Sequence, residues 1–150
     1  MDFDAELDKL VAAKNKRDAD ARRAADYSKD QQTAFLAVWA AHARDVVQPT
    51  LDALADSARA RGMDVKVDYA VDVHTGAIHE ATLTAFKPLG PLKARSYLKV
   101  QAGVGSQRVV VESYIHGSGA GAVTQTFPIG VVNAEFLKKE TMAVARSIIG

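Results

Sequence analysis

The chain has no cysteine among its 150 residues. This absence excludes disulfide bonds, thiolate catalysis and zinc sites built from cysteine. It also favours a reducing compartment, because small secreted domains often depend on disulfides. A chain of this length buries enough surface to fold as one domain without disulfides or a metal. We therefore expect a single cytoplasmic domain over residues 1–150, with no metal and no cofactor.

Long hydrophobic runs and an excess of one charge are also missing. No apolar stretch approaches the roughly 20 residues that cross a bilayer, and the charged start at Met1–Asp4 is unlike a signal peptide. The formal net charge is only +1 at pH 7, which gives no general attraction to nucleic acid or to an anionic membrane. The sequence thus predicts a soluble protein without a membrane partner.

Glycine is absent from the first 61 residues, and all ten glycines lie at or beyond Gly62. The only proline in this first part is Pro49. Glycine marks sharp turns and is disfavoured inside helices. The distribution predicts a helical part followed by a turn-rich part, which together define an α+β fold.

The first helical segment has little to bury. Apolar residues at helical spacing occur only at Phe3, Leu7, Leu10 and Val11, and alanine and charge follow. Such a segment forms a helix by propensity. We expect residues 1–27 to form an arm that either projects from the domain as a solvated helix or packs on a second copy.

A second helix is expected over residues 29–61. The motif Ser28-Lys29-Asp30-Gln31 is typical of a capping box and predicts a helix start at Ser28, although an unbroken continuation of the first helix fits the sequence too. The apolar series shifts by one residue around Pro49, which lacks the N–H that would bond to Asp45. We predict a kink near Pro49 and a C-cap at Gly62.

Five strands and a final helix are predicted beyond Gly62 from the alternation of apolar and polar residues. Short connections between them favour an antiparallel meander. Pairing of Val73 with Ala77 places His79 opposite Val71 on the inward face. Asn133 is expected to cap the last helix. The predicted strand ranges are 64–73, 77–86, 94–102, 107–116 and 122–129, with loops at 87–93, 103–105 and 117–121.

Four residues are candidates for a ligand pocket or an enzyme site between the sheet and the helices. They are Trp39 and His42 on the apolar stripe of the second helix, and Tyr69 and His79 on the inward face of the first two strands. For each histidine the alternative is a core residue with a satisfied ring nitrogen. No histidine pair has metal-ligand spacing and no catalytic set stands out, so an enzyme is the less favoured class.

The outward face of the sheet carries cations between aromatic side chains. Such a surface can stack bases and bind phosphates, but it also fits a solvated or dimer-facing sheet. The candidates for surface binding are Arg95, Tyr97, Lys99, Arg108 and Tyr114.

The leading functional hypothesis is a non-enzymatic protein that acts through protein contacts as a homodimer. A single meander leaves one sheet face and two edges to cover, the alanine-rich arm offers a second surface, and two-fold association is the commonest form of oligomer. The alternatives are nucleic-acid binding through the sheet face and a ligand or enzyme pocket between sheet and helices.

Overall fold

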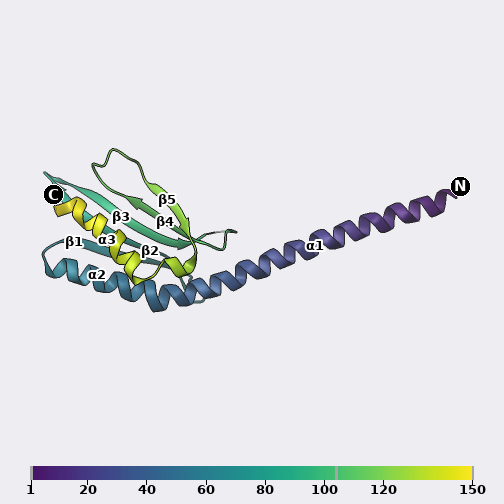
Figure 1. Cartoon of the computed structure of the whole chain (residues 1–150), viewed down its shortest axis with the longest axis horizontal. Coiled ribbons are helices and arrows are strands. Elements are labelled where there is room, and N and C mark those ends of the chain that lie inside the picture. Colours follow the sequence, from purple (N-terminus) through teal and green to yellow (C-terminus); the bar gives the residue numbers. More distant parts are fainter. Residues whose placement is uncertain (1, 104, 150) are drawn as a thin grey trace.

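The computed structural model describes residues 2–103 and 105–149, so Val104 of the predicted loop lies outside the described residues. The chain forms a long N-terminal helix, a five-stranded antiparallel sheet and a C-terminal helix (Figure 1). This arrangement confirms the predicted α+β class.

Helix α1 spans Phe3–His42. Its N-cap is Asp2, whose carboxylate accepts the N–H of Asp4 at 3.1 Å. The helix passes Ser28 without interruption, so the predicted start at Ser28 is wrong and the continuous alternative holds. The physical reason is that no glycine or proline precedes Pro49, and the alanine-rich backbone therefore continues its hydrogen bonds through the capping motif.

A π-helical turn over Ala43–Val47 joins α1 to helix α2, Gln48–Ala60. The N–H of Gln48 donates to the carbonyl of Ala43, five residues back. Pro49 follows in the first turn of α2. Figure 1 shows the helical path bending at this junction, so the predicted kink near Pro49 takes the form of a π turn.

The π turn keeps one helical stripe on the sheet. Four successive steps of four residues drift by about 160° around an ideal helix of 3.6 residues per turn. The wider turn reduces this drift. As a result every member of the series is at most 2% exposed: Trp39, Ala43, Val47, Leu51 and Ala55.

Helix α2 ends at Ala60 with Arg61 as its C-cap, so the glycine predicted as the cap lies one residue further, at the C′ position. Gly62 has φ +82° and its N–H donates to Arg59, while the N–H of Met63 donates to Ala58. These two bonds form a Schellman cap, which favours glycine because an L side chain is strained at positive φ.

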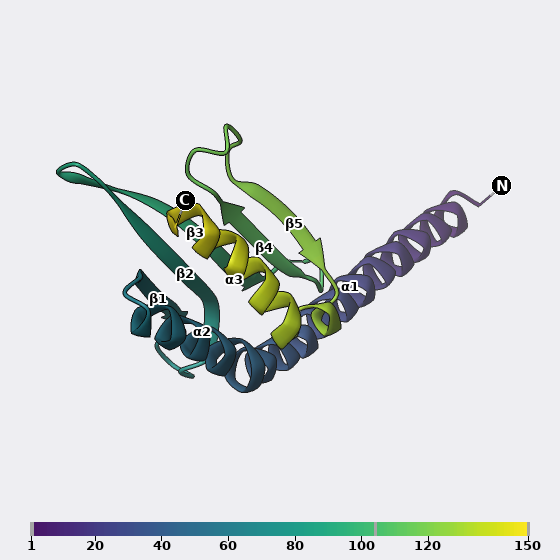
Figure 2. The same cartoon turned by 60° about the vertical axis from the view of Figure 1, so that its left-hand side comes forward.

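The sheet is the predicted meander, in the order β1-β2-β3-β4-β5. Helix α2 and the C-terminal helix α3 lie side by side over one face (Figure 2), and the core lies between them and the sheet. The strands are β1 Asp64–Val71, β2 Ile78–Leu89, β3 Leu92–Ala102, β4 Val109–Tyr114 and β5 Val123–Phe127.

Helix α3 spans Ala134–Ile149. The side chain of Asn133 accepts the N–H of Phe136 at 2.9 Å, which confirms the predicted cap. The buried residues of α3 are Leu137, Thr141 and Val144.

The last strand, β5, is shorter than predicted, because Ile129 begins a 3₁₀ turn after Pro128.

The first hairpin follows the predicted register only as far as Ala70. Val65, Val67 and Tyr69 pair as expected, but Val71 pairs with Ile78 across a bulge. The bulge leaves His79 exposed, so its predicted inward position is wrong, and Val73 lies outside β1 at 89% exposure. The cause is Asp72, whose carboxylate accepts the N–H groups of the next turn and ends the alternation early.

The predicted loop over residues 87–93 is mostly strand. Pro88 pairs with Lys93, and only Gly90 and Pro91 form the turn. Proline is tolerated here because the pairing of β1 with β2 ends at Phe86. Beyond that point β2 has β3 on one side only, so a residue without an N–H costs no hydrogen bond on the other side.

Candidate functional site

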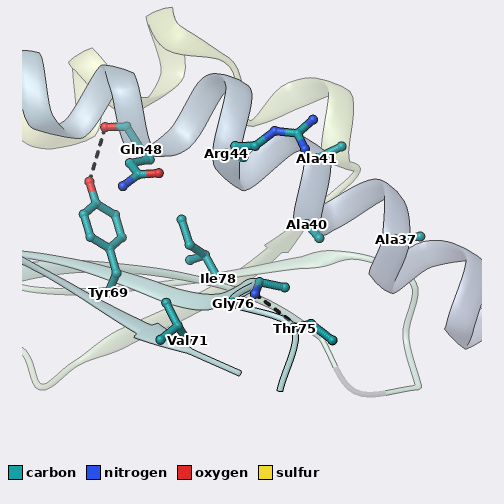
Figure 3. Close-up of a pocket in the computed structure, with 11 residues that line it drawn as sticks. Ala37, Ala40, Ala41, Arg44, Gln48, Tyr69, Val71, Thr75, Gly76 and Ile78 are labelled. Atoms are coloured by element: carbon teal, nitrogen blue, oxygen red, sulfur yellow. Dashed lines mark hydrogen bonds between the residues drawn. The ribbon is translucent and has the colours of Figure 1, made fainter. Parts of the chain in front are cut away.

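A cavity of about 650 Å³ lies between the end of α1, the π turn and the first hairpin. Figure 3 shows the small side chains of Ala37, Ala40 and Ala41 on the helical side and Ile78 and Val71 on the sheet side. The alanines are what open this space, because larger side chains on the helix would fill it. Its volume falls within the usual range for small-molecule sites.

Two polar side chains that line the cavity, Tyr69 and Arg44, are already engaged. The hydroxyl of Tyr69 donates to the Asp52 carboxylate at 2.6 Å and lies 3.2 Å from the Gln48 carbonyl. Partial burial, together with the Asp52 bond, raises the pKa of Tyr69 well above its ordinary value. Arg44 forms two bonds to Asp45, at 2.8 and 3.1 Å. The cavity therefore offers shape and an apolar wall, but its charged groups are satisfied within the chain.

The other three pocket candidates lie elsewhere. Trp39 is 2% exposed and donates to the carbonyl of Ile78 at 3.1 Å, so it anchors α1 to the sheet. His42 bonds through its ring to the carbonyl of Val132. His79 lies 3.5 Å from Asp72 at the exposed bulge. Only Tyr69 of the four lines the cavity.

The outward sheet face has a fixed aromatic pair. The rings of Tyr97 and Tyr114 stack with centroids 5.8 Å apart. The hydroxyl of Tyr97 donates to Glu112 at 2.8 Å, and this bond raises the pKa of Tyr97. Both tyrosines and Arg95 line a shallow hollow of about 550 Å³ beside the tip of the β2–β3 hairpin.

Two cations of this face, Lys99 and Arg108, already interact with other side chains and are therefore only partly available to bind a phosphate. Lys99 lies 3.8 Å from Glu80 and 3.9 Å from Glu112. Arg108 donates to Thr126 on β5. It lies just before β4, at the turn of the β3–β4 hairpin, whereas Arg95 lies near the start of β3 at the other end of the strand. The structure thus brings Arg95, Tyr97, Lys99 and Tyr114 onto one surface, balances Lys99 with carboxylates, and places Arg108 apart.

After the cavity and the outward sheet face, the third candidate site is the part of α1 that projects from the domain. Among the described residues, the first side chains of α1 that bond to the body are Gln31 and Gln32. Gln31 accepts from Gln107, and Gln32 donates to the Gly103 carbonyl and accepts the N–H of Gly105, all in the segment between β3 and β4. The preceding residues 3–30 project as a helix about 42 Å long (Figure 1), and from here on the name arm refers to this range rather than to the predicted 1–27. All their side chains are exposed except the half-buried Ala19.

The end of the arm exposes large apolar side chains. Phe3 is 72% exposed, Leu7 42%, Leu10 66% and Val11 56%. Phe3, Leu7 and Leu10 fall at i, i+4 and i+7 and share one face of the helix. The sequence shows this stripe, but it does not show that the stripe lies beyond the domain with nothing to cover it.

Comparison of the chain with protein-family models, with curated proteins and with solved structures finds no match. In the part of the chain that the structure describes, no helix is long and apolar enough to cross a membrane. Nor do three or more metal-ligating side chains come together among these residues.

Proposed function

We propose that this protein is a cytoplasmic, non-enzymatic protein that self-associates through its arm. The observation that carries the proposal is the exposed apolar stripe at the free end of α1. A stripe of this kind on a projecting helix is typical of a surface that another chain covers.

The energetics support association of moderate strength. Burying a leucine or phenylalanine side chain contributes about 1.5–3 kcal/mol. The stripes of two chains together contribute on the order of 10 kcal/mol by this measure, which offsets much of the estimated cost of 4–15 kcal/mol for associating two molecules. The arm is already helical, so little further ordering is needed.

A nucleic-acid interface on the sheet face is the second candidate. Arg95 favours it, because its guanidinium has no ion-pair partner among the described residues and lies in one hollow with Tyr97 and Tyr114. The carboxylates around Lys99 disfavour it. It predicts binding of single-stranded RNA that weakens steeply with salt and is lost in Arg95→Ala; unchanged binding in that variant excludes this interface.

The test of self-association is size-exclusion chromatography with light scattering on two arm variants. Leu7→Asp/Leu10→Asp places charge within the stripe and is expected to reduce the mass to that of a monomer. Ala5→Asp/Ala12→Asp adds the same charge on the opposite face of the helix and should associate as the wild type does. Equal behaviour of the two variants would refute the proposal.

A further inference from the structure

A groove lies between α2 and α3. It has a volume of about 310 Å³. Its walls are largely apolar, with Leu54, Ala58 and Met63 on one side and Met142 and Ala145 on the other. Met142 is 46% exposed, and flexible methionine side chains adapt well to an incoming apolar group.

The polar part of the groove is positively charged. Arg61 and Lys138 line it, and its described lining includes no carboxylate. A neighbouring hollow along α3 adds Lys139 and Arg146, with Glu135 as its one acidic residue among those described. The groove therefore has an apolar floor and a predominantly basic rim.

One buried polar group of the groove has no partner. Thr141 is only 8% exposed, and its hydroxyl makes no hydrogen bond to any described residue. Buried hydroxyls usually find an acceptor. The hydroxyl oxygen is shielded from solvent, so an incoming carboxylate accepts from it only after the adjacent side chains of the groove move.

The arm has the chemistry that complements this groove. Its apolar side chains follow the i, i+4, i+7 pattern of a helix that docks in a groove. Carboxylates flank them, and the side chains of Asp4, Glu6 and Asp8 form no ion pair with any described residue. The acidic end of one molecule thus matches the basic rim of another in charge, and the apolar stripe matches the floor.

We propose that the arm tip, Phe3–Val11, of one molecule docks in the α2–α3 groove of a second copy. The inference rests on the proposed self-association and names the surface that receives the arm. Reciprocal docking closes a two-fold dimer, whereas one-way docking extends into open chains.

Mixing two variants of the full-length protein tests this assignment. The arm variant is Leu7→Asp/Leu10→Asp, which keeps the groove. The groove variant is Lys138→Glu/Met142→Glu, which alters two exposed side chains and keeps the arm. A charge-matched control, Lys66→Glu/Ala143→Glu, changes exposed positions outside the groove lining. Circular dichroism establishes that all of them are folded.

Docking in the groove predicts that each variant alone is monomeric and that the control associates as the wild type does. Mixed together, the arm and groove variants should form a 1:1 dimer, because one supplies an intact arm and the other an intact groove. Its affinity should exceed that of either variant for itself by at least about tenfold.

The outcomes separate the two proposals. If the groove variant alone associates like the wild type while the arm variant does not, the groove assignment is wrong and arm-to-arm pairing replaces it. A mixture that stays monomeric also overturns the assignment. If the arm variant alone associates like the wild type, the proposed function fails as well.

Discussion

Replacing Trp39 with phenylalanine tests whether this residue fixes the long helix to the sheet. The indole N–H donates to the Ile78 carbonyl at 3.1 Å, and the side chain is 2% exposed. Phenylalanine keeps an aromatic ring but removes the donor. Loss of the indole bond to this buried carbonyl costs about 1–3 kcal/mol, and the smaller ring adds about 1 kcal/mol by leaving space in the core.

We therefore expect Trp39→Phe to lower the free energy of unfolding by about 2–4 kcal/mol, a large part of the 5–15 kcal/mol typical of a domain. Urea denaturation followed by far-ultraviolet circular dichroism measures this change without using tryptophan fluorescence. Leu36→Ala is the control, because Leu36 is 42% exposed on the same helix and should change stability by less than about 0.5 kcal/mol. A Trp39→Phe variant as stable as this control would refute the anchoring argument.

Three further predictions concern buried or strained positions. Thr141→Val removes an unpaired buried hydroxyl and should raise the free energy of unfolding by about 1 kcal/mol in urea titration; a loss of stability would show that the hydroxyl is satisfied. Gly103→Ala places a Cβ 2.9 Å from the Arg108 carbonyl oxygen, so the free energy of unfolding should fall by about 1–2 kcal/mol. Thermal denaturation should show a lower melting temperature, and an unchanged one would contradict the crowding. Because the folded-state pKa of Tyr69 is raised, its contribution to stability is present below about pH 10 and falls as the pH rises above that value. Absorbance titration of the wild type and Tyr69→Phe should show that the variant lacks a phenol that ionises above the ordinary range of tyrosine, and loss of an early-titrating group in the variant would contradict this.

The alternation of apolar and polar residues predicted the parts of the sheet where burial of one apolar face decides the strand pairing. Alternation set the pairing of β1 with β2 as far as Ala70, because slipping by one residue would turn the apolar face outward. It failed at Asp72, where a side chain that binds backbone N–H groups outweighs the alternation of Val71 and Val73. The loop at 87–93, predicted from its prolines and Gly90, was also wrong, because the position of Pro88 beyond the end of β1 depends on strand lengths that local sequence does not reveal.

The candidate sites were predictable to different degrees. The apolar stripe of the arm is visible in the sequence, yet its isolation depends on where α1 first contacts the body, at Gln31 and Gln32. The cavity beside Tyr69 and the α2–α3 groove form between segments far apart in the chain. No local pattern predicts them, because their shapes depend on how helices and strands pack.

The most direct test of the central claim is sedimentation equilibrium of the wild-type protein over a range of micromolar concentrations. Self-association through the arm predicts an average mass that rises with concentration from the 16.0 kDa of one chain to twice that value or more. It further predicts that this rise disappears in Leu7→Asp/Leu10→Asp. A wild-type mass that stays at one chain throughout would contradict the account.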